Sequence, residues 1–261
     1  MIKYLIKFPI FKRLIPSISL RVLKLIKKNK KFYKIGNIDF YFDFLDPIDR
    51  KIILNKEYEH DQVSFLEKIM KKYFFSYFLD IGANSGYYSF YFADKFKTLK
   101  IKAFEPSIDA FDKFNKTLNK NAFQNIQIFN FGLSDSERKV KNRSIIKNGL
   151  VQSNSAVLDE RDKFAVKDFQ INSALLKVGD EFFNFRDQNL SIKIDVEGHE
   201  LFTLKGMINT LKQNKCLILV ETSKDRFDEV DSFLSEINYK YIFKSDYRPD
   251  YIYTNIVSEM N

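Results

Sequence analysis

One stretch constrains the fold more than any other: an apolar run that ends in two closely spaced glycines. Residues 77–81 (YFLDI) are mostly apolar and are typical of a buried strand. Gly82 and Gly86 follow, with Asn84 between them, and a helix-length segment begins near residue 86. A strand, a glycine turn and a helix in this order are typical of the nucleotide-binding edge of a doubly wound α/β sheet. Gly82 would let the chain turn, and Gly86 would let the helix start lie close to the strand or to a ligand.

A carboxylate follows at the end of the next predicted strand. Glu105 comes directly after residues 101–104, and it lies 19 residues beyond Gly86. In nucleotide-binding α/β sheets, a carboxylate at this place accepts hydrogen bonds from both ribose hydroxyls. The glycine spacing is shorter than G-x-G-x-x-G and lacks a third glycine, which disfavours a dinucleotide. S-adenosylmethionine fits better, because it has a ribose and an amino-acid group but no pyrophosphate.

Four motifs together resemble those of the FkbM-type methyltransferases. They occur in the family's order, as residues 78–89 (FLDIGANSGYYS), 103–107 (AFEPS), 132–135 (GLSD) and 192–200 (IKIDVEGHE). The resemblance spans about residues 55–222, whereas the first 50 residues and the segment 136–190 match no motif. It implies a Rossmann-like fold, S-adenosylmethionine as the methyl donor, and most often a hydroxyl acceptor on a sugar or a polyketide.

The succession of apolar segments predicts one Rossmann-like class I methyltransferase domain over residues 35–261, with a seven-stranded, mostly parallel sheet. We expect strands at 77–82, 100–105, 126–131, 191–195 and 216–221, followed by an antiparallel C-terminal hairpin at 239–244 and 250–257. Helices are expected at 62–72, 86–96, 107–121, 199–212 and 224–237, with two short strands within residues 32–45. The segment 136–190 interrupts this alternation, and we expect a β-hairpin insertion there that could act as a mobile lid.

The cofactor pocket is expected at the carboxyl ends of the parallel strands. Asp80 could order the glycine loop or accept from the cofactor's ammonium, and backbone N–H groups of the loop could meet the methionine carboxylate. Glu105 is expected to hold the ribose. Ser134 and Asp135 could border the adenine, although an ordinary surface turn would have the same composition. The predicted cofactor-binding residues are Asp80, Gly82, Asn84, Gly86, Glu105, Pro106, Ser134 and Asp135.

FkbM-type methyltransferases often have a tyrosine–glutamate pair near the cofactor. The resemblance implies that Tyr58 and Glu59 are this pair. A solvated helix start, favoured by its acidic charge, is the alternative interpretation of these two residues.

The motif at 192–200 supplies the candidate catalytic residues Asp195, Glu197 and His199. Asp195 closes the fourth parallel strand, and Gly198 would let the following polar groups gather. Methyl transfer to a hydroxyl requires a group that removes the hydroxyl proton, for which a carboxylate or an imidazole is suitable. His199 has the more suitable pKa and Asp195 the better expected position.

Two other interpretations of this motif stay open. His199 and Glu200 could simply cap a helix and complement its dipole. Asp195, Glu197 and His199 could also coordinate a divalent cation, but without a second acidic cluster we predict no metal site. Lys193 could pair with a neighbouring carboxylate, and no chemistry is assigned to it.

The net charge of +9 is concentrated in residues 1–34, which contain 11 Lys or Arg and no acid. Within this arm, residues 17–31 predict a basic amphipathic helix, with Ile18, Val22, Leu25 and Ile26 on one face. Such a helix could dock on an anionic membrane surface or pack on the domain. No apolar run is long enough for a signal peptide or a membrane span.

The rest of the chain has 32 basic and 34 acidic residues, so the catalytic region is close to neutral. A nucleic-acid substrate is therefore not expected. The single cysteine, Cys216, excludes an intrachain disulfide and fits a reducing cytoplasm. The abundance of Phe and Tyr beside much Lys, Asn and Ile, with no Trp, suggests an AT-rich bacterial genome.

These observations favour an O-methyltransferase that acts on a glycan or a lipid-linked sugar. A catalytically silent domain of the same fold, binding a partner or a membrane, is the alternative, and a nucleic-acid methyltransferase is a weaker one. Asp80, Gly82, Gly86, Glu105 and Asp195 are all present, and a silent domain would not need all five. The sequence carries no signal for an oligomeric state.

Overall fold

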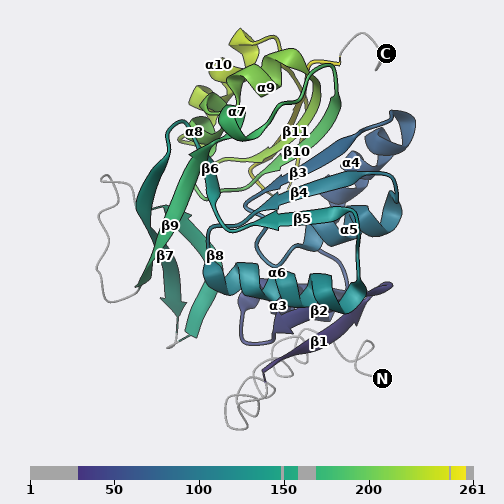
Figure 1. Cartoon of the computed structure of the whole chain (residues 1–261), viewed down its shortest axis with the longest axis vertical. Coiled ribbons are helices and arrows are strands. Elements are labelled where there is room, and N and C mark those ends of the chain that lie inside the picture. The colour runs from purple at the N-terminus through teal and green to yellow at the C-terminus, as the bar shows by residue number, and fades with distance from the viewer. Residues whose placement is uncertain (1–28, 148–149, 158–168, 247, 257–261) are drawn as a thin grey trace.

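The centre of the molecule is one mixed β-sheet (Figure 1). The computed structural model describes residues 29–147, 150–157, 169–246 and 248–256. Seven strands lie in the order β12-β13-β11-β10-β3-β4-β5. Their bounds are β3 Tyr77–Ile81, β4 Lys100–Phe104, β5 Ile126–Phe129, β10 Asn189–Ile194, β11 Lys215–Glu221, β12 Lys240–Lys244 and β13 Asp250–Thr254. Only the pairs that β13 makes with β11 and β12 are antiparallel, which confirms the predicted sheet.

Both faces of this sheet are buried, because its strands are apolar on both sides. Along β3, Phe78 packs into one hydrophobic cluster, and Leu79 and Ile81 pack into another. The first cluster includes side chains from α4 (His60–Lys72), α5 (Tyr87–Lys95) and α6 (Ile108–Asn121). The second includes side chains from α8 (Glu200–Lys205), α9 (Ile208–Gln213) and α10 (Phe227–Glu236). The sheet therefore has helices on both faces, as a Rossmann-like fold requires.

The helix predicted at 199–212 is interrupted in the structure. It forms α8 and α9, with Gly206 between them. A Cβ atom on Gly206 would lie 1.8 Å from the carbonyl oxygen of Ser134. The glycine therefore lets this break pack directly against the backbone of a neighbouring strand.

The segment 136–190 forms more than the predicted hairpin. The strands β7 (Arg138–Lys147), β8 (Leu150–Val157) and β9 (Phe169–Val178) join β6 (Gly132–Ser134) in a second sheet, in the order β6-β9-β7-β8. Figure 1 shows β7, β8 and β9 projecting beside the central sheet. The short helix α7 (Gly179–Phe182) follows β9 and leads back to β10. A role for this insertion as a lid stays a prediction.

The N-terminal part of the described chain is a hairpin of β1 (Lys30–Ile35) and β2 (Ile38–Asp43), as predicted around Gly36. The helix predicted for residues 17–31 is wrong at its end, because Lys30 and Lys31 pair with Asp43 and Phe42 in this hairpin. The remainder of that prediction lies in residues 1–28, outside the described residues. None of the described helices combines the length and the apolar character that a membrane crossing requires.

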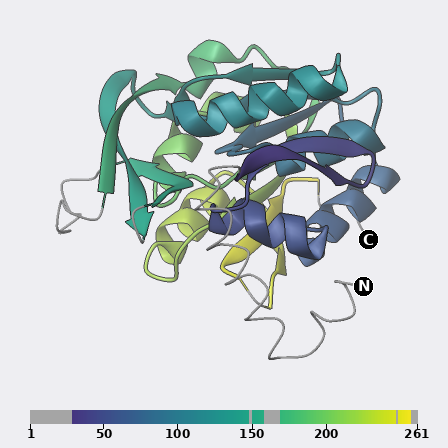
Figure 2. The ribbon, with the colours of Figure 1, turned by 90° about the horizontal axis from the view of Figure 1, so that it is seen from below.

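The hairpin is followed by α3 (Pro47–Asn55), and an ion pair attaches this region to α6. Figure 2 shows the hairpin between α6 and α3. The Asp46 side chain caps α3 by accepting from the N–H of Ile48, and Pro47 suits the first helical turn. Inside the interface, Lys113 Nζ of α6 lies 2.7 Å from Asp49 Oδ2, and both side chains are buried. This pair fixes α3, which forms one wall of the cavity described below.

Replacing Lys113 by methionine should destabilise the fold by about 3–5 kcal/mol, because it leaves the Asp49 carboxylate buried without its cation. Burial already raises the pKa of Asp49 to about 6, against the opposing effect of Lys113. Urea unfolding at pH 7.5 measures the change. Lys68→Met, which removes an exposed lysine of α4, is the control and should cost less than about 0.5 kcal/mol. Equal losses of unfolding free energy in the two variants would contradict the role of the Lys113–Asp49 ion pair.

Candidate functional site

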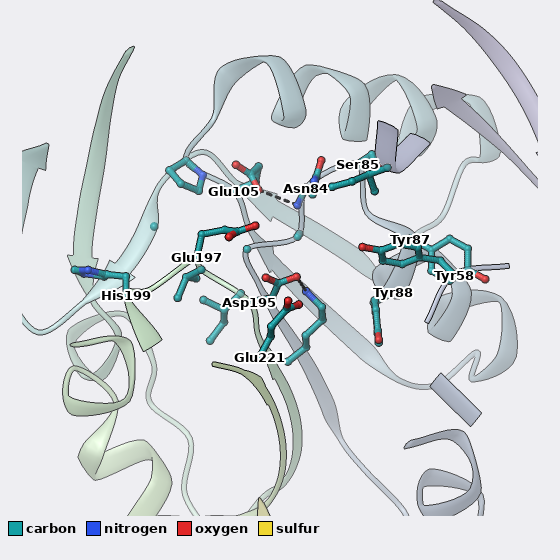
Figure 3. A pocket seen from close by; sticks show the side chains of 18 of the residues that line it. Tyr58, Asn84, Ser85, Tyr87, Tyr88, Glu105, Asp195, Glu197, His199 and Glu221 are labelled. Carbon is teal, nitrogen blue, oxygen red and sulfur yellow. Dashed lines mark hydrogen bonds and ion pairs between the residues drawn. The ribbon is translucent and has the colours of Figure 1, made fainter. Parts of the chain in front are cut away.

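A cavity of about 390 Å³ lies where the carboxyl ends of β3, β4, β10 and β11 meet (Figure 3). In open α/β sheets, ligands bind at such a position. The walls come from α3, from the loop between β3 and α5, from the carboxyl ends of β4, β10 and β11, from β6 and β9, and from the turn between β12 and β13. Polar and charged side chains on the walls include Lys51, Tyr58, Asn84, Ser85, Tyr87, Tyr88, Glu105, Lys193, Asp195, Glu197, His199, Glu221 and Arg248.

Two glycines allow the chain to approach other elements closely at this place. Gly82 and Gly86 have φ values of +79° and +88°, a region in which other residues are strained. A Cβ atom on Gly82 would lie 1.9 Å from the carbonyl oxygen of Asp195. On Gly86 it would lie 2.5 Å from the Phe114 ring. Gly82 therefore joins the β3 end to the β10 end, and Gly86 lets α5 begin against α6.

The expectation that N–H groups from Gly82 to Gly86 bind the methionine carboxylate needs a correction. The N–H groups of Gly82 and Ala83 both donate to the Phe104 carbonyl, and the N–H of Gly86 donates to the Ala83 carbonyl. Asn84 N donates to Glu105 Oε2 at 2.8 Å. These donors hold the loop in place and are not directed at a ligand. Within the described chain, the N–H groups of Ser85 and Tyr87 make no such internal bond and remain available.

Asp80 is buried beneath the loop and orders it. Its Oδ2 accepts from the backbone N–H and the hydroxyl of Ser89, at 3.1 and 2.6 Å. Ser89 lies in the first turn of α5, so the carboxylate fixes the helix start. Burial raises the pKa of Asp80, and the nearby Lys193 ammonium opposes that shift. Of the two roles considered for Asp80, the structure supports ordering of the loop.

Glu105 is held rigidly at the cavity wall. Its Oε2 accepts from Asn84 N and its Oε1 from Ser107 N, each at 2.8 Å. Burial raises the pKa of Glu105 to about 7 despite these two bonds. Each carboxylate oxygen has a further lone pair for a ribose hydroxyl. Pro106, the next residue, also lines the cavity.

Ser134 and Asp135 are not on the cavity wall, and the structure places Gly132 and Leu133 there instead. The reason is that residues 132–134 form strand β6, which a single sequence does not distinguish from a loop. Ser134 is buried, and its hydroxyl oxygen lies 2.9 Å from His199 Nε2. Asp135 pairs with Arg138 at 3.2 Å. The pair therefore lies behind the cavity wall, and its contact with the adenine stays a prediction.

The three candidate catalytic residues are not equivalent. Asp195 lies at the end of β10, with its side chain 23% exposed, and its Oδ2 lies 3.0 Å from Lys193 Nζ. Glu197 also lines the cavity and has a φ of +52° beside Gly198. His199 is 8% exposed, contacts Ser134 and stacks on Phe202 with 4.8 Å between ring centroids. Figure 3 shows His199 apart from Asp195, at the side of the cavity.

Several residues of the cavity wall were missed by sequence reasoning, and two of them, Glu221 and Arg248, form an ion pair there. Glu221 ends β11, and Arg248 comes from the turn between β12 and β13. Arg248 Nη2 pairs with Glu221 Oε2 and lies 3.2 Å from Glu59 Oε1. Glu221 could have been found as a carboxylate at the end of a predicted strand. Arg248 has no such signal, because only the turn brings it to the cavity.

Of the tyrosine–glutamate pair, only the tyrosine is among the residues that line the cavity. Tyr58 lines the cavity, and its ring lies 5.7 Å from that of Tyr87 between centroids. Glu59 is buried behind the wall, where its Oε2 accepts from the Tyr88 hydroxyl at 2.8 Å. Among the described residues, no group of three His, Cys, Asp or Glu side chains is arranged to hold a metal ion.

Comparison with known proteins assigns the chain to a family. Residues 80–241 match the Methyltransferase FkbM domain. The chain belongs to the FkbM methyltransferase family. The match confirms the resemblance seen in the four motifs. The hairpin, α3 and the Tyr58–Glu59 pair precede the matched residues, and Arg248 follows them.

The solved structures that resemble this fold have low sequence identity to this chain. Precorrin-6y C5,15-methyltransferase from Geobacter metallireducens is 14% identical, covers 74% of this chain and 86% of its own, and has a TM-score of 0.44. A SAM-dependent methyltransferase from Aquifex aeolicus is 11% identical, with coverages of 76% and 98% and a TM-score of 0.40. TYW2 from M. jannaschii in complex with AdoMet is 9% identical, with coverages of 87% and 84% and a TM-score of 0.39. No curated protein matches the chain.

The cofactor of this FkbM methyltransferase is S-adenosylmethionine, and the described residues fit it. Glu105 presents a fixed carboxylate for the ribose. The buried Oδ1 of Asn84, on the same wall, has no hydrogen-bond partner within the described chain, so it can accept from a bound donor. Ser85 and Tyr87 have backbone N–H groups available for a carboxylate at the start of α5.

Glu105→Ala should weaken the binding of S-adenosylhomocysteine by about 1.5–3 kcal/mol, because two charge-assisted hydrogen bonds to the ribose are lost. Isothermal titration calorimetry on the folded variant measures the change. Glu67→Gln, which alters a carboxyl group that pairs with Lys71 away from the cavity, is the control. Unchanged affinity in Glu105→Ala would overturn the ribose assignment.

The same measurement at several pH values tests the ionisation of Glu105. Its pKa of about 7 means that the ionised fraction grows between pH 6 and pH 8. Ribose hydroxyls donate to the ionised form, so affinity should rise with pH, by up to about tenfold over this window. The Glu105→Gln variant should lose that rise.

Proposed function

We propose that this FkbM methyltransferase transfers a methyl group to a hydroxyl of a sugar, a glycan or a lipid-linked glycan. The supporting observation is the Asp195 carboxylate, which is partly exposed at the end of β10 and lines the same cavity as Glu105. When bound, S-adenosylmethionine supplies a methyl group on a sulfonium centre that an oxygen nucleophile can displace. A hydroxyl is a weak nucleophile at neutral pH, so the protein must accept its proton.

Asp195 is suited to that role. Lys193 Nζ donates to Asp195 Oδ2 at 3.0 Å, and the Asp195 side chain remains partly exposed to the cavity. His199 has the more suitable ordinary pKa, but its Nε2 is engaged with Ser134 and its ring is packed on Phe202. We therefore assign proton acceptance to Asp195 and a positioning role to His199. The Tyr58 and Tyr87 rings on the wall provide flat apolar surfaces of the kind that sugar rings contact.

The acceptor class is tested by incubating the protein with S-adenosylmethionine carrying a labelled methyl group and with separated cell fractions: glycans, lipid-linked sugars, protein and RNA. We expect label in a glycan fraction as an alkali-stable methyl ether. Alkali-labile label would indicate a methyl ester, and label in RNA would replace this proposal by a nucleic-acid substrate. Cofactor binding without transfer to any fraction would support the silent-domain alternative.

Asp195→Asn should reduce turnover on the labelled fraction by about 10²-fold or more, because the proton acceptor is lost. Binding of S-adenosylhomocysteine should stay largely intact, since Asp195 is not part of the ribose site. Asp187→Asn, at an exposed aspartate in the loop before β10, is the matched control. If Asp195→Asn turns over at the wild-type rate, proton acceptance belongs to another group.

We further propose that the basic N-terminal arm places the enzyme on anionic membranes, where lipid-linked glycans are assembled. The support is the apolar stripe and the excess of basic residues in positions 1–34, each worth about 1 kcal/mol near an anionic surface. The full chain should sediment with phosphatidylglycerol vesicles at low salt, and less at high salt. Binding that ignores vesicle charge, or that survives deletion of residues 1–28, would refute this proposal.

A further inference from the structure

Two carboxyl groups end adjacent strands of the sheet and face the same cavity. The last paired residues of β10 and β11 are Ile194 and Val220, so Asp195 and Glu221 are the next neighbours across the two strands. Adjacent strands lie about 4.8 Å apart. Both residues line the cavity, and Figure 3 shows their side chains next to each other at its centre.

The corner of the cavity around this pair contains more acids than cations. Among the described residues, the interacting carboxyl groups there are Asp80, Asp195, Glu221, Glu59 and Asp250, and the cations are Lys193 and Arg248. Tyr58 and Tyr88 are the other titratable groups that face it, and both stay neutral because burial raises the pKa of each. All five acids cannot be ionised together in a half-buried space without a large repulsion, so at least one keeps a proton.

The contacts indicate which acid keeps it. Lys193 Nζ makes a 3.0 Å ion pair with Asp195 and has no other carboxylate within ion-pair distance among the described residues. Arg248 is instead divided among Glu221, Glu59 at 3.2 Å and Asp250 at 3.1 Å. Burial and the adjacent Asp195 charge raise the pKa of Glu221 to about 8, which Arg248 only partly offsets. Of the two adjacent carboxyl groups, Glu221 is therefore the one that keeps its proton at neutral pH, and Asp195, which has its own cation, is the one placed to accept a proton.

We infer that Glu221 is a second working carboxyl of the site, which donates a hydrogen bond to the acceptor beside the oxygen whose proton Asp195 accepts. This inference rests on the proposed hydroxyl acceptor. A donor and an acceptor on adjacent strand ends match two oxygens on neighbouring carbons, which makes the acceptor class a vicinal diol of a sugar. The acceptor oxygen would form a bond to the methyl carbon as the bond from that carbon to sulfur breaks and its electron pair goes to sulfur. The acceptor's O–H bond breaks and its proton passes to Asp195, while Glu221 keeps its own. Asp195 releases its proton to solvent after the product leaves. Arg248 is a positioning residue that directs Glu221 into the cavity.

The proton on Glu221 is tested on the full chain by NMR, with ¹³C-labelled glutamate side-chain carboxyls. The Glu221 signal is identified by its loss in Glu221→Gln. We expect a titration midpoint near pH 8, falling by at least about one pH unit in Asp195→Asn, because the neighbouring negative charge is removed. Asp231→Asn, at an acid that accepts from Tyr253 and does not face Glu221, should leave the midpoint unchanged. A wild-type midpoint near the ordinary value of about 4.3, or one unmoved by Asp195→Asn, overturns the inference.

The donor role is tested by labelled methyl transfer to the fraction that accepts it in the assay above. Glu221→Gln keeps an N–H donor and should retain at least about ten times more activity than Glu221→Ala. The wild-type rate should fall above pH 8, as Glu221 loses its proton, and this fall should disappear in Glu221→Gln. Equal activities in the two variants overturn the donor role. The NMR titration needs no methyl transfer, so a failure of the proposed function appears separately, as the absence of a methyl ether product.

Discussion

The contact between Gly82 and the Asp195 backbone determines how the site is built. The N–H of Asp195 donates to the carbonyl of Ile81 at 3.0 Å, and the Asp195 carbonyl lies where a side chain on Gly82 would be. Any larger residue at position 82 would separate the two strand ends. Because they touch, the residues after β3 and β4 and the Asp195 carboxylate after β10 line one cavity.

Electrostatics then decides what the cavity can do. Lys193 pairs with Asp195, and Arg248 is shared among Glu59, Glu221 and Asp250. Removing a cation from such a place leaves buried negative charge without compensation, so these two residues hold the structure together as well as the site. With more acids than cations present, the carboxyl groups cannot all be ionised at once without a large repulsion. A site of this kind offers both a proton acceptor and a hydrogen-bond donor from the same residue type.

Most of the fold could be predicted from the local pattern of apolar residues and glycines along the sequence. The apolar run at 77–81, the two glycines and Glu105 each have a local signature, and they lie where that signature indicates. The same rule failed at residues 132–134, because three residues are too few to distinguish a strand from a loop. As a result, Ser134 faces His199 rather than a ligand. The loop N–H groups were expected at the cofactor, but the turn itself uses them.

Long-range partners were the part of the site that a single sequence does not reveal. Glu221 and Arg248 are separated by an entire helix and a strand, and they meet only because β13 inserts beside β11. The antiparallel strand β13 has a consequence for biosynthesis. It pairs with both β11 and β12, so the sheet remains incomplete until nearly all of the described chain has emerged from the ribosome. Up to that point Arg248 is absent from the cavity, and the nascent protein would carry its acidic corner without its second cation. The cavity therefore becomes complete only when β13 has joined the sheet, rather than growing along with the earlier strands.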